Sequence, residues 1–267
     1  MYKFGFIGTG NMGSAIAKAA VKAVGKESII LSNRTEEKAK ILAESIGCKY
    51  GTNEETAKNS KYIFLGVKPQ MMSEMLYGIK NILSQRSDRF VLVTMAAGLS
   101  IERIQNMAGG NYPVIRIMPN TPVSIGKGMI LCSSSKEVST EETEEFKEGM
   151  AFSGRLDFIE ERLIDAGSAV SGCGPAYAYL FIEALADGAV ECGLPRAKAL
   201  EYACQMLVGS ASLVLESKKH PGELKDAVCS PGGTTIAGVH ALERNGFRNA
   251  AMDCVKAAYD KTLDLGK

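Results

Sequence analysis

The first 160 residues alternate short apolar runs with longer stretches in which apolar residues recur every three or four positions. Several short runs are apolar at consecutive positions and rich in Val, Ile and Phe, which is typical of strands covered on both faces. The predicted strands span 2–7, 28–32, 62–67, 90–95, 114–118, 129–132 and 156–159. The predicted helices between them include 14–24, 36–45 and one that opens at a capping box over 139–142. Residues 1–160 are therefore expected to form an α/β domain with a mostly parallel sheet.

From residue 161 to residue 267 the alternation stops and only helical patterns remain. The stretch 176–192 is apolar on nearly every side, and the next helix starts at Pro195. Apolar residues then recur at helical spacing as far as a break at 220–222, after which two more helices are expected, separated near Gly246. Residues 161–267 are therefore expected to form an all-helical C-terminal domain.

The apolar helix over 176–192 raises the question of what covers it. A helical segment of about 100 residues cannot easily enclose a helix that is apolar all round. We expect it to be buried against a second copy of the chain, which makes a homodimer through the C-terminal helices. The alternative is a monomer in which this helix packs against the N-terminal domain.

The composition is that of an ordinary globular protein, and it narrows the class of partner. Hydrophobic residues make up 46% and charged residues 23% of the 267 residues. Lys and Arg together number 31 against 30 for Asp and Glu, so the net charge is +1. Such neutrality is not typical of proteins that bind nucleic acid or an anionic membrane, so a small molecule is the expected partner.

The same counts predict a compartment and exclude some kinds of site. No apolar stretch approaches the ~18 residues of a transmembrane helix, and the first apolar run meets Gly5 too early for a secretory signal. The seven cysteines include no Cys-x-x-Cys pair, and only two His are present, so neither disulfides nor a metal site are indicated. A cytoplasmic protein with reduced thiols is expected.

The 28 glycines are the unusual feature of the composition, and a first cluster of them follows the first strand. This cluster reads Gly8-Thr9-Gly10-Asn11-Met12-Gly13. It has the G-x-G-x-x-G spacing of a dinucleotide-binding turn, in the required context between an apolar strand and a helix. Gly8 permits the turn, Gly10 lets backbone approach a pyrophosphate, and Gly13 lets the helix pack on the strand. The six residues are candidate cofactor ligands in a Rossmann-type domain, with a purely structural turn as the alternative.

The end of the second strand discriminates between the two nicotinamide cofactors. NAD sites usually place an acidic residue there, whereas this strand ends in Ser32-Asn33-Arg34. Arg34 can form a charge-assisted bond to a 2′-phosphate, and Ser32 and Asn33 offer neutral donors. The sequence therefore predicts NADPH, with NADH as a weaker possibility. The alternative is an exposed Arg34 without a role.

Two further strand ends are expected to meet the cofactor, because ligands lie at the carboxyl edge of such sheets. Val67-Lys68-Pro69 follows one strand, and Ala96-Ala97-Gly98 follows another. Small residues and a proline allow a flat ring to lie against backbone there. Lys68 is a candidate catalytic acid, although a charge partner for a phosphate is the simpler interpretation.

A second glycine cluster lies in the C-terminal half, directly before a helical pattern. It contains Ser230, Gly232, Gly233, Thr234 and Thr235. Glycines, exposed N–H groups and hydroxyls at a first helical turn are suited to bind an anion such as a carboxylate. An ordinary capped loop is the alternative.

At this point the sequence resembles the pyrroline-5-carboxylate reductase family. The resemblance extends over essentially the whole chain, and its most specific part runs from Pro221 to Glu243. The other matching segments are 8–13, 67–69, 96–98, 118–122 and 171–177. Cys173 departs from the pattern, since serine is common at this position in the family.

The resemblance implies reduction of L-1-pyrroline-5-carboxylate to L-proline with NAD(P)H, the last step of proline biosynthesis. It implies that Asn53 touches the adenosine side of the cofactor. It also implies that Ser230, Gly233, Thr234 and Thr235 hold the substrate carboxylate and ring. A Thr235 hydroxyl could support the ring nitrogen, whereas His240 is expected to be a packing residue. The family dimerises by interlocking C-terminal helices, with rings of dimers in some members.

Three other functions stay open. Two are reductases, one of another cyclic imino acid and one of β-hydroxyacids. The second family needs a lysine on its first interdomain helix, and 166–189 contains none. The third is a non-catalytic NADP-binding sensor or scaffold, which only an assay separates from an enzyme.

Overall fold

The computed structural model describes residues 1–265, and the chain falls into two compact units. Unit 1 comprises Met1–Cys173 together with the chain from Ala258 onward, and unit 2 comprises Gly174–Ala257. The boundary expected between residues 160 and 161 stays a prediction about domains. By contacts, the helix over Glu161–Ser171 is part of unit 1.

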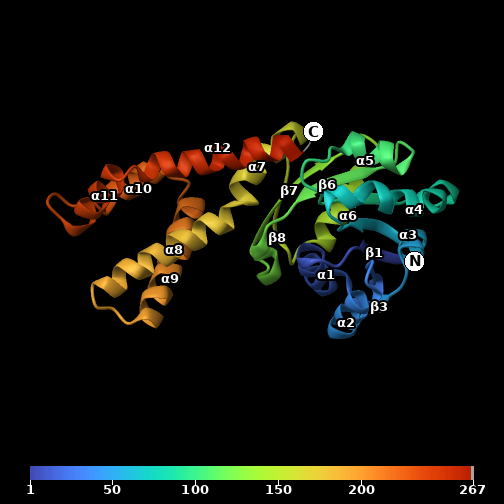
Figure 1. The fold of residues 1–267 in the computed structure, drawn as a ribbon, viewed down its shortest axis with the longest axis horizontal. Coiled ribbons are helices and arrows are strands. Elements are labelled where there is room, and N and C mark those ends of the chain that lie inside the picture. The colour runs from blue at the N-terminus through green and yellow to red at the C-terminus, as the bar shows by residue number, and fades with distance from the viewer. Residues whose placement is uncertain (266–267) are drawn as a thin grey trace. The chain divides into compact units, whose positions relative to one another are not determined.

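The elements are shown in Figure 1. The strands are β1 (Tyr2–Ile7), β2 (Ile29–Ser32), β3 (Lys49–Tyr50), β4 (Ser60–Leu65), β5 (Val91–Thr94), β6 (Val114–Met118), β7 (Gly128–Ser134) and β8 (Gly154–Phe158). The helices that begin in unit 1 are α1 (Asn11–Val24), α2 (Glu36–Ile46), α3 (Asn53–Asn59), α4 (Met72–Gln85), α5 (Ile101–Ala108), α6 (Thr140–Gly149) and α7 (Glu161–Ser171). Those that begin in unit 2 are α8 (Gly174–Glu191), α9 (Arg196–Ser217), α10 (Pro221–Ala227), α11 (Thr234–Arg244) and α12 (Phe247–Leu265).

The strands of unit 1 form one sheet in the order β3-β2-β1-β4-β5-β6-β7-β8. Every neighbouring pair is parallel except β6 and β7, so the expected mostly parallel sheet is confirmed. The strand order reverses between β1 and β4. In open α/β sheets, ligands bind outside the carboxyl ends of the strands at such a point.

Several predicted bounds were wrong by one or two residues, and one strand was missed. β3 has only two residues, both exposed, so it lacks the apolar run that marks the other strands. β4 ends at Leu65 rather than at residue 67, because Gly66 leaves the sheet to approach the turn after β1. The bounds of β1 and β6 were predicted correctly at both ends, whereas the other strands were predicted closely only at their apolar centres.

Two separate cores cover the two faces of the sheet, because successive strand residues point to opposite sides. Phe6 and Phe64 stack face to face in the first core, where α1, α2 and α6 pack. Ile63 and Leu65 lie in the second core, under α3, α4 and α5. The helices thus sit on both faces, as an α/β domain requires.

A buried carboxylate makes the stability of unit 1 depend on pH. Glu142 is 5% exposed and accepts hydrogen bonds from Arg89 Nε at 2.7 Å and Arg89 Nη2 at 2.9 Å. Burial raises the pKa of Glu142, but the bonds from Arg89 and from the Ser139 backbone lower it by more, so it lies below the usual 4.5. A depressed pKa gives stability that is present above pH 4.5 and is lost as the pH falls through the folded value.

We therefore expect the unfolding temperature to fall as the pH drops below about 4.5. Glu142→Gln is expected to flatten this dependence, which thermal unfolding between neutral and acid pH measures. Glu144→Gln, on the exposed side of the same helix, is the control and is expected to leave the curve unchanged. An unaltered curve for Glu142→Gln would contradict the assignment.

Unit 2 is helical, as expected, but buries almost nothing by itself. Of residues 174–257, only Ala186, Ala199 and Ala203 are buried. Large apolar side chains are exposed instead, among them Tyr179 at 58% and Leu180 at 69%. Soluble monomers rarely leave so many large apolar side chains uncovered, so these helices are suited to be covered by another chain.

The two helices expected after the break are α11 and α12, which are separated near Gly246 as predicted, but a third helix, α10, begins inside the expected break and was missed. Pro221 begins α10 instead of only ending α9, which fits its preference for the first helical position. The ring nitrogen Nδ1 of His220 accepts from Gly222 N at 3.0 Å and caps the new helix. Across residues 1–265, no helix is both long and apolar enough to cross a membrane.

Candidate functional site

The first glycine cluster lies where the strand order of unit 1 reverses. Gly8 N donates to Ser32 O at 2.9 Å, and Gly66 N donates to Ile7 O at 2.7 Å, so the loops after β1 and β4 meet. Gly8 has φ +100°, a conformation that favours glycine. A Cβ on Gly13 would lie 2.4 Å from Gly8 O, so α1 can approach the turn only because this position has no side chain. The roles expected for these two glycines agree with this packing.

Gly10 behaves differently from its neighbours in the motif. A Cβ built on Gly10 would meet nothing within 4 Å, so open space lies in front of it. It is the N-cap of α1, and no side chain caps that helix end. The first N–H groups of α1 are therefore available to an anion, which is the arrangement that a pyrophosphate requires.

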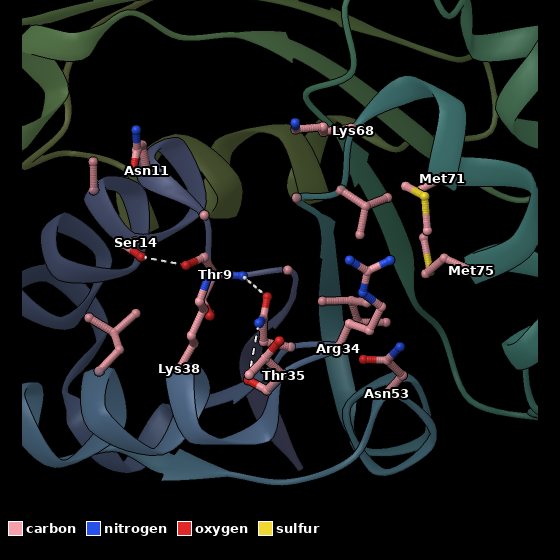
Figure 2. A pocket seen from close by; sticks show the side chains of 18 of the residues that line it. Thr9, Asn11, Ser14, Arg34, Thr35, Lys38, Asn53, Lys68, Met71 and Met75 are labelled. Carbon is pink, nitrogen blue, oxygen red and sulfur yellow. Dashed lines mark hydrogen bonds between the residues drawn. The ribbon is translucent and has the colours of Figure 1, made fainter.

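A cavity of about 1230 Å³ opens in front of this loop (Figure 2). This exceeds the ~300–1,000 Å³ typical of small-ligand pockets, so an extended dinucleotide fits it by size. The predicted cofactor residues that line it are Gly8, Thr9, Gly10, Asn11, Asn33, Arg34, Asn53, Val67 and Lys68. The predicted residues outside its lining are Met12, Gly13, Ser32, Pro69, Ala96, Ala97 and Gly98.

The tip of β2 presents one free cation to this cavity. Ser32 is 1% exposed and its hydroxyl donates to Phe6 O at 3.2 Å, so its donor is engaged within the sheet. Asn33 Oδ1 accepts from Thr9 N at 3.2 Å, which ties the glycine loop to the tip of β2. Arg34 is exposed and forms no ion pair with any residue that the structure describes. Arg34 and Asn53 lie at one end of the cavity, away from Lys68 (Figure 2).

Two cations that the sequence analysis missed line the same cavity. Lys18 lies one turn after Ser14 on α1, and Lys38 lies in the first turn of α2. Within residues 1–265 neither forms an ion pair. Helical spacing from Ser14 and from the helix start at Thr35 could have identified them. With Arg34 and Lys68 they make the cavity positive, against two lining carboxylates, Glu54 and Glu74.

The segment after β5 lies beside the cavity without lining it. Its position is set by the pairing of β5 with β4, whose own carboxyl end carries Val67 and Lys68. Ala96 is buried, whereas Ala97 and Gly98 are half-buried, and Gly98 has φ +73°. These residues therefore occupy the sheet edge at which a cofactor ring is expected.

The second glycine cluster forms the start of α11 in unit 2. Gly232 has φ +67°, and Gly233 N donates to Ser230 O at 3.0 Å, which closes a tight turn. Gly233 is the N-cap and has no side chain to cap the helix, so the first N–H groups of α11 remain available. Thr234 and Thr235 are exposed at this helix end. His240 is exposed in the single chain, so the packing role expected for it is not fulfilled within unit 2.

Two family models match the chain, one in each half. Residues 3–98 match the model described as NADP oxidoreductase coenzyme F420-dependent. Residues 161–265 match the model described as pyrroline-5-carboxylate reductase dimerisation. The two matches agree with an N-terminal dinucleotide-binding part followed by a helical part.

Full-length relatives and solved structures indicate the same family over the whole chain. A pyrroline-5-carboxylate reductase of Pisum sativum is 39% identical over 99% of this chain and 96% of its own length. The enzyme of Escherichia coli is 38% identical over 99% of this chain and 98% of its own. The Plasmodium falciparum reductase, solved with NADP bound, is 33% identical with a TM-score of 0.87 and covers 100% of this chain and 98% of its own. The Streptococcus pyogenes enzyme reaches 0.88 at 35% identity, over 98% of both chains. The chain therefore belongs to the pyrroline-5-carboxylate reductase family.

Proposed function

We propose that this chain reduces L-1-pyrroline-5-carboxylate to L-proline with NADPH, which is the last step of proline biosynthesis. The observation that carries the proposal is the extent of the similarity, which covers 99% of the chain at 38–39% identity. It therefore includes both the glycine loop of unit 1 and the Ser230–Thr235 loop of unit 2.

The residues of unit 1 fit the cofactor group by group. The α1 N-terminus at Gly10 would hold the pyrophosphate, and Asn53 would contact the adenosine side. Arg34 would hold the 2′-phosphate. The tip of β2 carries no acidic residue that would repel this phosphate. The segment 96–98 and Val67 would form the wall for the nicotinamide ring. When bound, NADPH supplies a hydride to the C=N carbon of the imine.

The residues of unit 2 would bind the other reactant. The free N–H groups at the start of α11 and the Ser230 hydroxyl suit a carboxylate, without any arginine. An imine carbon accepts hydride best when its ring nitrogen is protonated. The Thr235 hydroxyl would hydrogen-bond this nitrogen and keep the ring in one orientation.

Arg34→Ala is expected to raise the KM for NADPH by roughly 10- to 100-fold and to change the KM for NADH little. A charge-assisted hydrogen bond is worth about 1.5–3 kcal/mol, and only NADPH has the 2′-phosphate that receives it. Steady-state kinetics with each cofactor measure the effect, with Arg103→Ala, on α5 and outside the cavity lining, as the control. Equal effects on both cofactors would contradict the role of Arg34.

The assay that tests the function is loss of NADPH absorbance with pyrroline-5-carboxylate as substrate. The same assay with the six-membered ring homologue and with NADH measures specificity for the substrate and the cofactor. Turnover of the five-membered imine supports the proposal. NADPH binding without turnover of any imine would favour a sensor or scaffold instead.

The match of residues 161–265 to a dimerisation model supports self-association of the chain. We further propose that the copies meet through the exposed apolar faces of α8 and α9, as a homodimer that could assemble into a ring of dimers in the cytoplasm. Analytical ultracentrifugation measures the assembly, and fractionation of the source cells measures the location.

A further inference from the structure

A buried arginine lies under the segment where the nicotinamide ring is expected. Arg116 is on β6, and its side chain is 4% exposed. In the sheet it is paired with Thr94, the last residue of β5, two residues before Ala96. The proposed function assigns no role to this buried charge.

Two carboxylates of α7 hold the guanidinium of Arg116. Its Nη2 donates to Asp165 Oδ1 at 2.5 Å, and its Nη1 donates to Glu161 Oε1 at 3.3 Å. Glu161 Oε1 also accepts from the backbone N–H of Ile101 at 2.7 Å. Ile101 is the first residue of α5, so one carboxylate oxygen joins Arg116 to the backbone three residues after the segment 96–98.

Packing of Ala96 and Leu99 in the second core holds the segment 96–98 from one side, but its own hydrogen bonds are weak. Ala96 N lies 3.4 Å from Thr94 Oγ1, and Leu99 N lies 3.5 Å from Ala96 O, so the hydrogen bonds within the segment are long. Gly98, with φ +73°, adds backbone freedom. The bond of 2.7 Å from Ile101 N to Glu161, three residues after Gly98, is shorter than either of these two hydrogen bonds and fixes the backbone on the carboxyl side of the segment.

Glu161 can act as a tether because α7 is itself fixed. Ile164 packs against Met118 and Leu131 in a small core of unit 1. At the far end of α7, Asn120 Nδ2 donates to Ser171 O at 2.9 Å. The Glu161 carboxylate is therefore carried by a helix that is anchored along its length.

We propose that Glu161, oriented by Arg116, is a positioning residue that fixes the segment 96–98 for hydride transfer. This inference rests on the proposed function, because it assumes that the nicotinamide ring lies against the segment. A displacement of about 1 Å at a reacting centre can lower a rate roughly 100-fold, so a loose wall would reduce turnover more than binding.

The test compares three variants in the full-length chain. Glu161→Ala is expected to lower kcat by roughly 10- to 100-fold, with little change in the Kd of NADPH, since the adenosine and pyrophosphate contacts lie elsewhere. The isotope effect on kcat with NADPH deuterated at the transferable position is expected to rise. Glu161→Gln keeps an oxygen that accepts from Ile101 and is expected to restore most of the turnover. Asp165→Asn, which removes charge from the same guanidinium without touching α5, is the matched control and is expected to keep kcat.

Hydrogen–deuterium exchange gives a readout that does not depend on turnover. Exchange over residues 96–101 is expected to accelerate in Glu161→Ala and not in Asp165→Asn. Unaltered kcat in folded Glu161→Ala, or equal losses in Glu161→Ala and Asp165→Asn, would overturn the inference. Absence of turnover in the wild-type chain would overturn the proposed function and the inference together, whereas normal wild-type turnover with an unaltered variant would overturn the inference alone.

Discussion

Thr235→Val is expected to lower kcat by roughly 10²- to 10³-fold with pyrroline-5-carboxylate and NADPH, the range typical for loss of one well-placed hydrogen bond at a reacting centre. The side chain keeps its shape, so α11 should begin at the same residue. The free N–H groups at that helix end would still be available to the carboxylate, so the KM for the imine should change much less than kcat. Stopped-flow measurement of NADPH oxidation separates the chemical step from product release.

Thr235→Ser is the matched control for this change. It keeps the hydroxyl and loses only a methyl group, and it is expected to retain most of the turnover. A different pattern is expected if Thr235 binds only the carboxylate. In that case KM would rise in Thr235→Val while kcat stayed near the wild-type value, and the proposed hydrogen bond to the ring nitrogen would be withdrawn.

The double variant Glu161→Gln with Asp165→Asn is expected to destabilise unit 1 by about 3 kcal/mol. It keeps the volume of both side chains but removes both counter-charges from a guanidinium that is 4% exposed. Its Nε already has no acceptor among the residues described, so the group has no spare partner. The value lies at the lower end of the usual range because the carboxylates are 30% and 24% exposed, and water can approach from their side.

The effect should depend on which member of the cluster is removed. Arg116→Met takes away the buried charge and leaves carboxylates that remain partly hydrated, so it should cost much less than the double variant. Adding Arg116→Met to the double variant should restore stability. Denaturant unfolding of the wild type, Arg116→Met, the double variant and the triple variant measures their free energies of unfolding. The control is removal of the exposed ion pair between Glu160 and Arg162 at the start of the same helix, which is expected to cost less than about 1 kcal/mol. Equal losses of stability in all three variants would contradict the view that an unpaired buried charge causes the effect.

The fold was largely predictable because burial on both faces of a sheet leaves a strong apolar signal in short runs. The signal is absent where strand residues are exposed, as they are at Lys49 and Tyr50 of β3. The apolar signal also cannot indicate whether two neighbouring strands run parallel or antiparallel. No local pattern marks β7 as antiparallel to β6, since that depends on the path of the chain through Thr121–Ile125 between them.

The candidate site was predictable where a backbone requirement dictates the residue. Gly8 and Gly13 could be placed because only glycine fits their contacts. Side-chain partners were not predictable in this way, because they depend on distant residues. Ser32 faces Phe6 O across the sheet, and Glu161 reaches Ile101 from a helix that is 60 residues away in the sequence.

The scarcity of buried residues in unit 2 has a consequence for how the protein is made. A segment with three buried alanines cannot offset the conformational entropy lost on folding, so its folded state would depend on the concentration of chains. Residues 1–173, by contrast, contain both cores of the sheet and leave the ribosome first. We therefore expect newly synthesised chains to carry a folded sheet with both of its cores and an incompletely folded helical part, which completes its folding only when it meets a second chain. Low expression would then lower the fraction of working protein as well as its amount.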